Sequence, residues 1–421
     1  MNEKKLVPRR RFEEFQNADA WEQLRLEEIS DIRTGPFGST LHAKDYVKEG
    51  TPIITTEHFK NGDLPKQKDG IPQVSAEDLL RLQSYVLKTD DIVFSRVGSV
   101  DINALVTPFQ RDWLFSGRVL RVRTNNSIDS QYMHYELSTS RAKNDVISRA
   151  VGQTMPSINT EILKQTRVFI PTEIKEQKQI GAFLSNLDNL ITLHQRKLEK
   201  TKAMKSAYLA EMFPAECERV PKRRFTGFIK DWQKTMLGKL GNTYSGMSGK
   251  TKEDFGHGDA EFVTYMNVFK NEISDISLTE KVVLDNKQTE VKYGDVLFTT
   301  SSETPHEVGL SSIWLDNRPN VYLNSFCFGF RPTSEMNKLY LAYLLRSNEV
   351  RNQIEILAQG ISRYNISKGK VMEITISIPD YEEQQAIGEF FKKLDDSITN
   401  QQQKLKKLKA MKQAYLAEMF V

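Results

Sequence analysis

Two short glycine-containing segments carry residue types that bind anions through the backbone. TGPFGST occupies residues 34–40 and SGMSGKT occupies residues 245–251. A nucleotide-binding P-loop needs another glycine, separated by four residues from the glycine of its Gly-Lys pair. That position is Tyr244, and the first segment lacks the lysine. We therefore interpret both segments as tight turns at which the backbone approaches another group closely.

No other group of residues is typical of an active site. No GxGxxG segment follows an expected strand, no DPPY or NPPY tetrad of amino-methylation is present, and the six histidines lack metal-ligand spacing. Asp90, Asp91 and Asp295 precede expected strands, where aspartate usually forms turns. The sequence therefore predicts a binding protein without catalytic residues of its own.

The two glycine segments belong to a repeat that spans the chain. KAMKSAYLAEMF at 202–213 returns as KAMKQAYLAEMF at 409–420, and VPRRRFEEF at 7–15 returns as VPKRRFTGF at 220–228. Between the copies the offset is 208 in the region that pairs Tyr132 with Tyr340. The ends of each copy match closely, whereas the middle matches only at scattered positions. This pattern predicts one frame that carries two different binding surfaces.

Each copy is expected to fold as a strand-rich body followed by a long helix. The runs IITT, IVFS and LFSGRVLRVR in the first copy, and EFVTYM, DVLFTT and FCFGFRP in the second, are typical of short strands. Short helices are expected at YMHYELSTS and KLYLAYLLRS. Asp380 followed by Glu383 predicts a capping box at the start of the last helix.

Apolar residues in the two long helices are spaced by three and four, which is typical of a coiled coil. Each helix is expected to cover this stripe with its own repeat copy, as an antiparallel pair. Two separate bundles in separate domains are the alternative. The predicted class is α+β, with two pseudo-symmetric halves that each place a strand-rich domain before a long helix. The expected boundaries are 1–170 and 215–378 for the two domains, and 171–214 and 379–421 for the two helices.

Composition limits the class of protein. The 421 residues include 59 Lys and Arg against 55 Asp and Glu, a net charge of +4, which excludes a histone-like polycation. Cys217 and Cys327 are the two cysteines, too few for a disulfide framework, so a reducing cytoplasm is expected. Neither a signal peptide nor a membrane-spanning segment is expected.

The paired glycine turns, the FSRVGS strand end, the loops GQTMPSIN and GISRYNIS, and the doubled helix resemble the specificity subunit of type I restriction–modification enzymes. The resemblance covers essentially the whole chain. It implies a non-catalytic subunit in which each strand-rich target recognition domain reads one half of a split site in double-stranded DNA. The helices would set the distance between the half-sites.

The resemblance also implies partners that do the chemistry. Two methyltransferase subunits would dock on the chain, and restriction subunits would join them. Adenine-N6 methylation and ATP-dependent cleavage would occur on those partners, which would hold S-adenosylmethionine and ATP with magnesium. We expect no cofactor and no metal in this chain.

Candidate DNA contacts follow from side chains that suit phosphates or base edges. Lys250 is expected to contact phosphate, Arg96 guanine and Asn267 adenine, with a structural salt bridge as the alternative for Arg96. The full set of candidates in the first copy is Gly35, Gly38, Ser39, Thr40, Lys44, Thr55, Thr56, His58, Lys60, Ser95, Arg96 and Arg118. The set in the second copy is Gly246, Ser248, Gly249, Lys250, Thr251, Lys252, Tyr265, Asn267, Lys270, Thr300, Ser301, Asn324 and Arg363.

Two other functions remain open from the sequence. The chain could be a coiled-coil scaffold that joins two protein-binding β domains without DNA, although basic and hydroxyl side chains at both glycine turns favour DNA. An autonomous methyltransferase or nuclease would need a catalytic motif that the sequence lacks. The basic arms at 8–11 and 221–224 fit either solvated charges or partner contacts.

Overall fold

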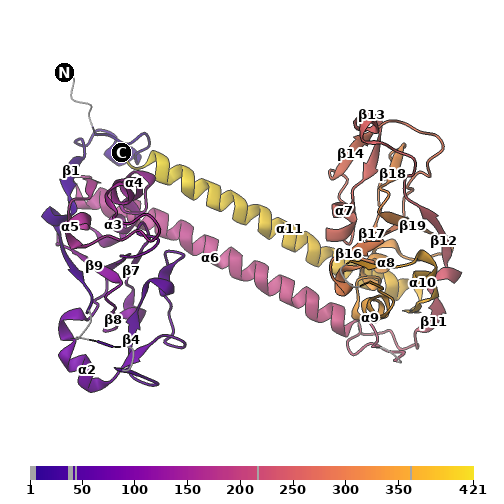
Figure 1. The fold of residues 1–421 in the computed structure, drawn as a ribbon, viewed down its shortest axis with the longest axis horizontal. Helices are drawn as coiled ribbons and strands as arrows, with labels where there is room; N and C mark the ends of the chain where they lie inside the picture. Colours follow the sequence, from indigo (N-terminus) through magenta and orange to yellow (C-terminus); the bar gives the residue numbers. More distant parts are fainter. Residues whose placement is uncertain (1–5, 37–40, 43–44, 216–217, 361–362) are drawn as a thin grey trace. The chain divides into compact units, whose positions relative to one another are not determined.

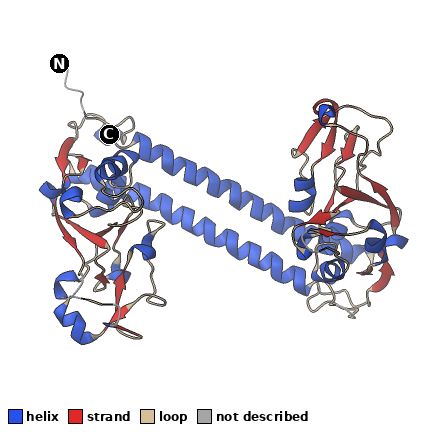
Figure 2. Cartoon of the chain, in the orientation of Figure 1, coloured by secondary structure: helices blue, strands red, loops and turns tan. Residues whose placement is uncertain are grey.

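The chain folds into two compact units, each with its own core (Figure 1). The computed structural model describes residues 6–36, 41–42, 45–215, 218–360 and 363–421. Unit 1 comprises residues 1–194 and 404–421, and unit 2 comprises residues 195–403. Each unit combines short strands with helices, which confirms the predicted α+β class (Figure 2).

The main sheet of unit 1 has four antiparallel strands in the order β2-β9-β6-β7. Its strands are β2 (Ser30–Thr34), β9 (Val119–Thr124), β6 (Ile92–Ser95) and β7 (Asn103–Leu105). The predicted run IVFS forms β6, and all four of its residues are buried, as a continuous apolar run in a central strand requires.

A second sheet in unit 1 has the order β3-β5-β4-β8 and contains one parallel pair, β4 with β8. Its strands are β3 (Tyr46–Val47), β5 (Gln73–Val74), β4 (Thr51–Ile54) and β8 (Leu114–Phe115). A separate antiparallel pair joins β1 (Glu22–Arg25) to β10 (Arg167–Ile170). The helices are α1 (Leu26–Ile29), α2 (Ala76–Arg81), α3 (Ser130–Glu136), α4 (Ser140–Arg149) and α5 (Thr160–Lys164).

Unit 2 repeats the main sheet in the equivalent order, β12-β19-β15-β17. These strands are β12 (Gly241–Ser245), β19 (Cys327–Pro332), β15 (Val296–Thr299) and β17 (Ser311–Ile313). The separate pair is also repeated, with β11 (Gln233–Met236) antiparallel to β21 (Thr375–Ile378). The shared frame predicted from the repeat is therefore confirmed at the level of strand order.

The second sheet of unit 2 departs from its counterpart. It has three strands in the order β14-β13-β18 and keeps one parallel pair, β13 with β18. The strands are β13 (Phe255–Val263), β14 (Thr279–Val282) and β18 (Val321–Leu323), and a further pair joins β16 (Ser301–Ser302) to β20 (Tyr364–Asn365). The helices are α7 (Tyr265–Lys270), α8 (Lys338–Leu344), α9 (Asn348–Ile356) and α10 (Lys368–Glu373).

One predicted strand is partly wrong. EFVTYM was expected to be extended throughout, but β13 ends at Val263 and Tyr265 begins α7. The side chain of Thr264 accepts a hydrogen bond from the amide of Asn267 at 3.2 Å. This N-cap satisfies a backbone donor of the first helical turn and so starts a helix where a strand pattern would continue.

Two helices of 38 residues, α6 (Ile174–Glu211) and α11 (Tyr381–Glu418), each contribute segments to both units. In unit 1, Phe183 contacts Tyr415 and Asp188 pairs with Lys412. In unit 2, Lys205 pairs with Asp395 and Tyr208 contacts Phe390. In both sets of contacts, residue numbers rise along α6 while those of the partners on α11 fall. Each unit therefore shows the predicted antiparallel pairing. None of the helices in the described part of the chain has the length and apolar character needed to cross a membrane.

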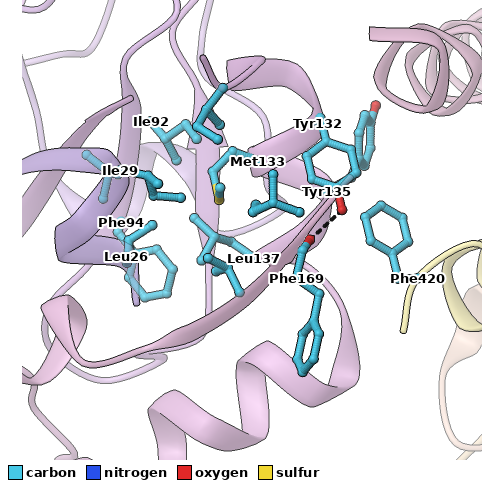
Figure 3. Packing of buried hydrophobic residues seen from close by; sticks show 14 of the residues in the cluster. Leu26, Ile29, Ile92, Phe94, Tyr132, Met133, Tyr135, Leu137, Phe169 and Phe420 are labelled. Atoms are coloured by element: carbon cyan, nitrogen blue, oxygen red, sulfur yellow. Dashed lines mark hydrogen bonds between the residues drawn. The ribbon is translucent and has the colours of Figure 1, made fainter. Parts of the chain in front are cut away.

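The core of unit 1 closes around aromatic rings from three parts of the sequence (Figure 3). Tyr132 on α3 stacks on Phe420, and the ring of Trp21 meets both edge-on. The hydroxyl of Tyr132 donates to the carbonyl of Phe169 on β10 at 2.6 Å. Unit 2 contains the same arrangement of Phe213, Trp232 and Tyr340, and the Tyr340 hydroxyl donates to Ser377 at 2.8 Å.

The basic arms anchor each unit to the start of its long helix. Arg11 makes a two-bond ion pair with Glu176 on α6, at 2.6 and 2.7 Å, and both side chains are buried. Arg224 makes the same pair with Glu383 on α11, at 2.7 and 2.6 Å. At least one arginine of each arm therefore has a structural role. The Glu383 carboxylate, predicted to form a capping box with Asp380, binds Arg224 in the structure.

Candidate nucleic-acid interface

In each unit a tight turn leads into the central strand β9 or β19. We call residues 116–118 of unit 1 and 324–326 of unit 2 the tip turns. In unit 2 Asn324 stabilises the turn, and the Nδ2 of its side chain donates a hydrogen bond to the carbonyl of Val263 at 3.0 Å. The carbonyl oxygen of the same side chain accepts from the amide of Phe326 at 2.9 Å. Asn324 is buried and holds this turn through these two bonds, which favours a structural role, and its contact with DNA stays a prediction.

Two other predicted segments converge on the tip turn of unit 2. The backbone amide and the hydroxyl of Thr300 both donate to the carbonyl of Phe326, at 3.0 and 2.8 Å. A Cβ atom added to Gly246 would lie 2.0 Å from the carbonyl oxygen of Asn324. Gly246 is therefore required because the backbone of its turn packs directly on the tip turn of the same unit, which is the close backbone approach predicted for this glycine.

Unit 1 builds its tip turn on the same backbone contacts. The amide of Arg96 donates to the carbonyl of Arg118 at 3.0 Å, in the place of the Thr300 contact. A Cβ atom added to Gly35 would lie 2.2 Å from the carbonyl oxygen of Ser116. In both units the tip turn is thus brought together with the end of the neighbouring strand, β6 or β15, and with the glycine turn. The glycine turn precedes the tip turn by about 80 residues in the sequence.

Arg96 is held inside this arrangement. Its guanidinium donates through Nη1 to the carbonyl of Gly117 at 2.9 Å and through Nε to the carbonyl of Ile158 at 3.2 Å. Ser95 beside it is buried and donates to the carbonyl of Val97 at 3.4 Å. These bonds favour a positioning role for Arg96, which supports the tip turn, whereas Arg118 at the turn itself is exposed.

The lysine of the second glycine turn is paired within the unit. The side chain of Lys250 is 10% exposed and lies 3.2 Å from the carboxylate of Asp285. Hydrogen bonds from Gln288, from the amide of Lys287 and from Lys250 lower the pKa of Asp285 to about 2, so this carboxylate is ionised at neutral pH. An ionised partner thus already pairs with Lys250, which favours a structural role, and the phosphate contact of Lys250 stays a prediction.

The remaining residues of that turn are more accessible. Ser248, Gly249, Thr251 and Lys252 are exposed, and Gly249 has a φ of 67°, which glycine tolerates without strain. The amide and hydroxyl of Thr251 donate to the carboxylate of Asp254, at 2.7 and 3.1 Å. Of the matching first turn, the predicted contacts Gly38, Ser39, Thr40 and Lys44 lie outside the described residues.

The segments 55–60 and 265–270 use several predicted contacts to build their own fold. His58 accepts a hydrogen bond from the amide of Thr55 at 3.0 Å, and burial lowers its pKa, so the neutral ring is favoured. Asn267 is fully buried, and its amide donates to the carbonyls of Asp275 and Leu278 at 2.7 and 3.2 Å. These bonds favour a structural role for Asn267, and its adenine contact stays a prediction.

The other predicted contacts of these segments differ in exposure. The hydroxyl of Tyr265 donates to the carbonyl of Ser301 at 2.6 Å, and burial raises the pKa of Tyr265. Ser301 is buried and pairs with Asn365 in the short sheet, while Arg363 just before that strand is exposed. Thr55 and Thr56 are half-buried.

Lys60 and Lys270 are exposed and line equivalent clefts between the strand-rich body and the helices of their units. The cleft of unit 1 has a volume of about 580 Å³ and that of unit 2 about 600 Å³. At the wall of the first, Tyr135 donates to the carboxylate of Asp188 at 2.7 Å, and Lys412 lies 2.6 Å from the same group. Tyr343, Asp395 and Lys205 repeat this triad in unit 2, at 2.7 and 2.6 Å.

Sequence reasoning missed Phe326, which is exposed at the tip turn of unit 2. The signal was present, because the constant offset of 208 pairs Arg118 with Phe326. The expectation of a metal-free chain stays a prediction, although in the described residues no three His, Cys, Asp or Glu side chains are grouped to hold a metal ion.

A duplicated frame that carries exposed, differing tip turns defines a modular binding protein of the α+β class. The sequence profile of the type I restriction modification DNA specificity domain matches residues 18–203 and again residues 229–410. These two matches cover most of the chain, which therefore belongs to this family. Its members are the DNA-specificity subunits of their systems and not the catalytic ones.

Curated relatives carry matching names. The chain is 29% identical over 407 residues to the type I restriction enzyme MjaX specificity subunit of Methanocaldococcus jannaschii, covering 90% of this chain and 87% of that protein. It is 23% identical over 358 residues to the MjaVIII specificity subunit of the same organism, covering 82% and 80% of the two chains.

Solved structures share the fold. The S subunit of a type I restriction–modification system from M. genitalium matches with a TM-score of 0.62 and 13% identity, over 99% of both chains. A chain from a study of complex assembly and conformational transition of the type I R-M system matches with a TM-score of 0.53 and 16% identity, over 95% of this chain and 97% of that one. At these identities the likeness concerns the fold alone.

Proposed function

We propose that each unit reads one half of a bipartite site in double-stranded DNA. The observation that carries this proposal is the pair of tip turns, in which the same backbone contacts present different exposed residues, Arg118 and Phe326. A shared frame with different exposed side chains is the arrangement needed to read two different sequences. Base edges are distinguished by such side chains, while phosphate contacts fix the position of the protein.

The accessible cations are the best candidates for phosphate contacts. Lys60, Lys252, Lys270 and Arg363 are exposed in the described structure. Each phosphate neutralised by such a cation releases counterions, so binding should weaken as salt increases. Lys250, Asn267 and Asn324 support the surface from within, and their replacement should act through the fold of the recognition domain.

The proposal extends to partners and location. As a specificity subunit, the chain would dock methyltransferase and restriction subunits, which would bind S-adenosylmethionine and ATP. It would act in the cytoplasm, where its DNA and these subunits are found. Membership in the family supports this assignment.

An exchange of the recognition segments tests the bipartite reading. Residues 30–124, from the start of β2 to the end of β9, would be replaced by the matching segment of a relative with a different target. The exchanged chain would be expressed with its methyltransferase partner, and the methylated motif would be determined by sequencing modified bases. We expect one half of the motif to change and the other half to persist.

The reciprocal exchange of residues 241–332 is the matched control, and it should change only the other half. If either exchange altered both halves, or if neither altered the motif, the assignment of one half-site to each unit would be incorrect. A wild-type chain that supports methylation without any sequence preference would contradict the DNA-reading function itself.

A further inference from the structure

The tip turns place two chemically different side chains at one position of the shared frame. Arg118 is exposed between the buried residues Ser116 and Val119. Phe326 is 58% exposed, while Asn324 before it and Cys327 after it are buried. Both units therefore project the same position away from the core, as a cation in unit 1 and as an aromatic ring in unit 2.

The position of Phe326 is fixed by its backbone. Its amide is held by Asn324 at 2.9 Å, and its carbonyl is held twice by Thr300, at 3.0 and 2.8 Å. The neighbouring Cys327 is buried and anchors this end of the turn in the core. Burial also raises the pKa of its thiol to about 12, so the thiol is neutral. Single exposed apolar residues are common, but the amide and the carbonyl of Phe326 are both hydrogen-bonded within the unit, so its backbone is held in place.

The surroundings of this ring favour nucleic acid. The glycine turn packs on residue 324, and the exposed Lys252 follows that turn by a few residues. Burial raises the pKa of the Tyr265 hydroxyl, and the positive charge of the exposed Arg363 nearby lowers it by a smaller amount. Tyr265 in turn donates to the residue that follows Thr300. Exposed cations and an exposed aromatic ring in one domain are typical of surfaces that combine phosphate contacts with contacts to bases.

We propose that Phe326 is a specificity-determining residue of unit 2, which contacts a base of its half-site through the apolar ring. Phe can contact the methyl group of thymine in the major groove or the face of an unstacked base. Arg118 would occupy the equivalent place in the other half-site. This inference rests on the proposed function and adds the residue, the half-site and the kind of contact.

The test uses the full-length chain with the methyltransferase subunit of its own system and a pool of randomised DNA duplexes. Phe326→Ala should weaken binding to the selected site about 10-fold or more and relax the preference at one base pair in one half-site. Phe326→Tyr should retain both, because it keeps the ring. Ile229→Ala is the matched control, since Ile229 is 88% exposed in the same unit but lies outside the tip turn.

The outcomes separate this inference from the proposed function. If the wild-type chain selects a bipartite site and Phe326→Ala selects the same site with the same affinity, Phe326 does not read DNA and only the inference fails. Loss of methyltransferase binding with unchanged DNA selection would assign the ring to a protein interface and would also overturn it. Equal melting temperatures of all variants would show that the effects do not come from unfolding.

Discussion

The two units keep one set of contacts unchanged and replace another. In both, a tyrosine of the body, an aspartate of one long helix and a lysine of the other form a triad: Tyr135, Asp188 and Lys412 in unit 1, and Tyr343, Asp395 and Lys205 in unit 2. The residues that are kept join the body to the helices. Residues within the sheets and at the tip turns are among those that differ.

The replaced contacts change together. In unit 1, Arg33 and Arg121 are opposite each other in the sheet, and both pair with Asp31. In unit 2 the same register places Tyr244 opposite Gly329, and the tyrosine hydroxyl donates to Asp295 at 2.7 Å. Gly329 on β19 leaves room for the ring of Tyr244 on β12. The two units therefore differ at both members of this cross-strand pair together.

This comparison explains why the dodecamer is repeated almost without change. Within 409–420, Lys412 joins the triad, Tyr415 meets Phe183, and Phe420 is buried against Trp21 and Tyr132. The copy at 202–213 makes the equivalent contacts in unit 2. Because both copies pack against equivalent neighbours, their sequences are constrained by the cores.

The largest effect should come from truncating the aromatic residue that ends each dodecamer. Phe420→Ala in unit 1 and Phe213→Ala in unit 2 should each lower the free energy of unfolding by about 3–5 kcal/mol, because each leaves a cavity among buried rings. Chemical denaturation of the full chain would measure this loss. Met204→Ala, at an exposed dodecamer position, is the control and should have little effect. Near-neutral results for both phenylalanines would mean that the dodecamer is retained for a partner and not for packing.

A smaller effect should follow when the cross-strand pair of unit 2 is altered. A Cβ atom at position 329 would lie 2.0 Å from Cζ of Tyr244, so Gly329→Ala should destabilise the chain by about 1–3 kcal/mol through overpacking. Combining it with Tyr244→Ala removes the clash, and the double variant should lose less stability than the sum of the single changes. Additive losses would show that the two positions are independent, against the paired divergence of the units.

The sequence predicted the shared fold of the two units better than it predicted which side chains are exposed for binding. The repeat predicted the equivalence of Tyr132 with Tyr340, and the structure places both in matching cores. It could not show that Asn324 and Asn267 face inward, because a polar residue that satisfies backbone groups has the same sequence signature as one that reads a base. The pairing of Lys250 with Asp285 likewise depends on a contact between distant segments.

A buried carboxyl group provides the last contrast between the units. Unit 1 has Glu136 on α3, paired with Arg141 on α4. In unit 2 the equivalent positions are Leu344 and Glu349, so the carboxyl group has moved to the second helix and faces Ser377, which donates to it at 2.6 Å. The other oxygen of Glu349 is buried without a hydrogen-bond partner among the described residues. Among the described residues no arginine pairs with Glu349 as Arg141 pairs with Glu136, and burial raises the pKa of Glu349 to about 7.

Per pH unit, the smallest predicted effect is a pH dependence of stability that comes from Glu349. Since its pKa is about 7 in the folded chain and 4.5 in the unfolded chain, the folded state binds an additional proton between these values. The stabilisation is therefore complete below about pH 4.5 and is lost as the pH rises through 7, at no more than about 1.4 kcal/mol per pH unit. Glu349→Gln should remove this contribution, and Glu355→Gln, at an exposed position of the same helix, should not. Thermal unfolding from pH 5 to pH 8 would measure the difference, and parallel pH profiles for wild type and Glu349→Gln would show that Glu349 is ionised throughout. In that case the side chain would need a compensating charge, as Glu136 has in Arg141, and the two units would differ less than their sequences suggest.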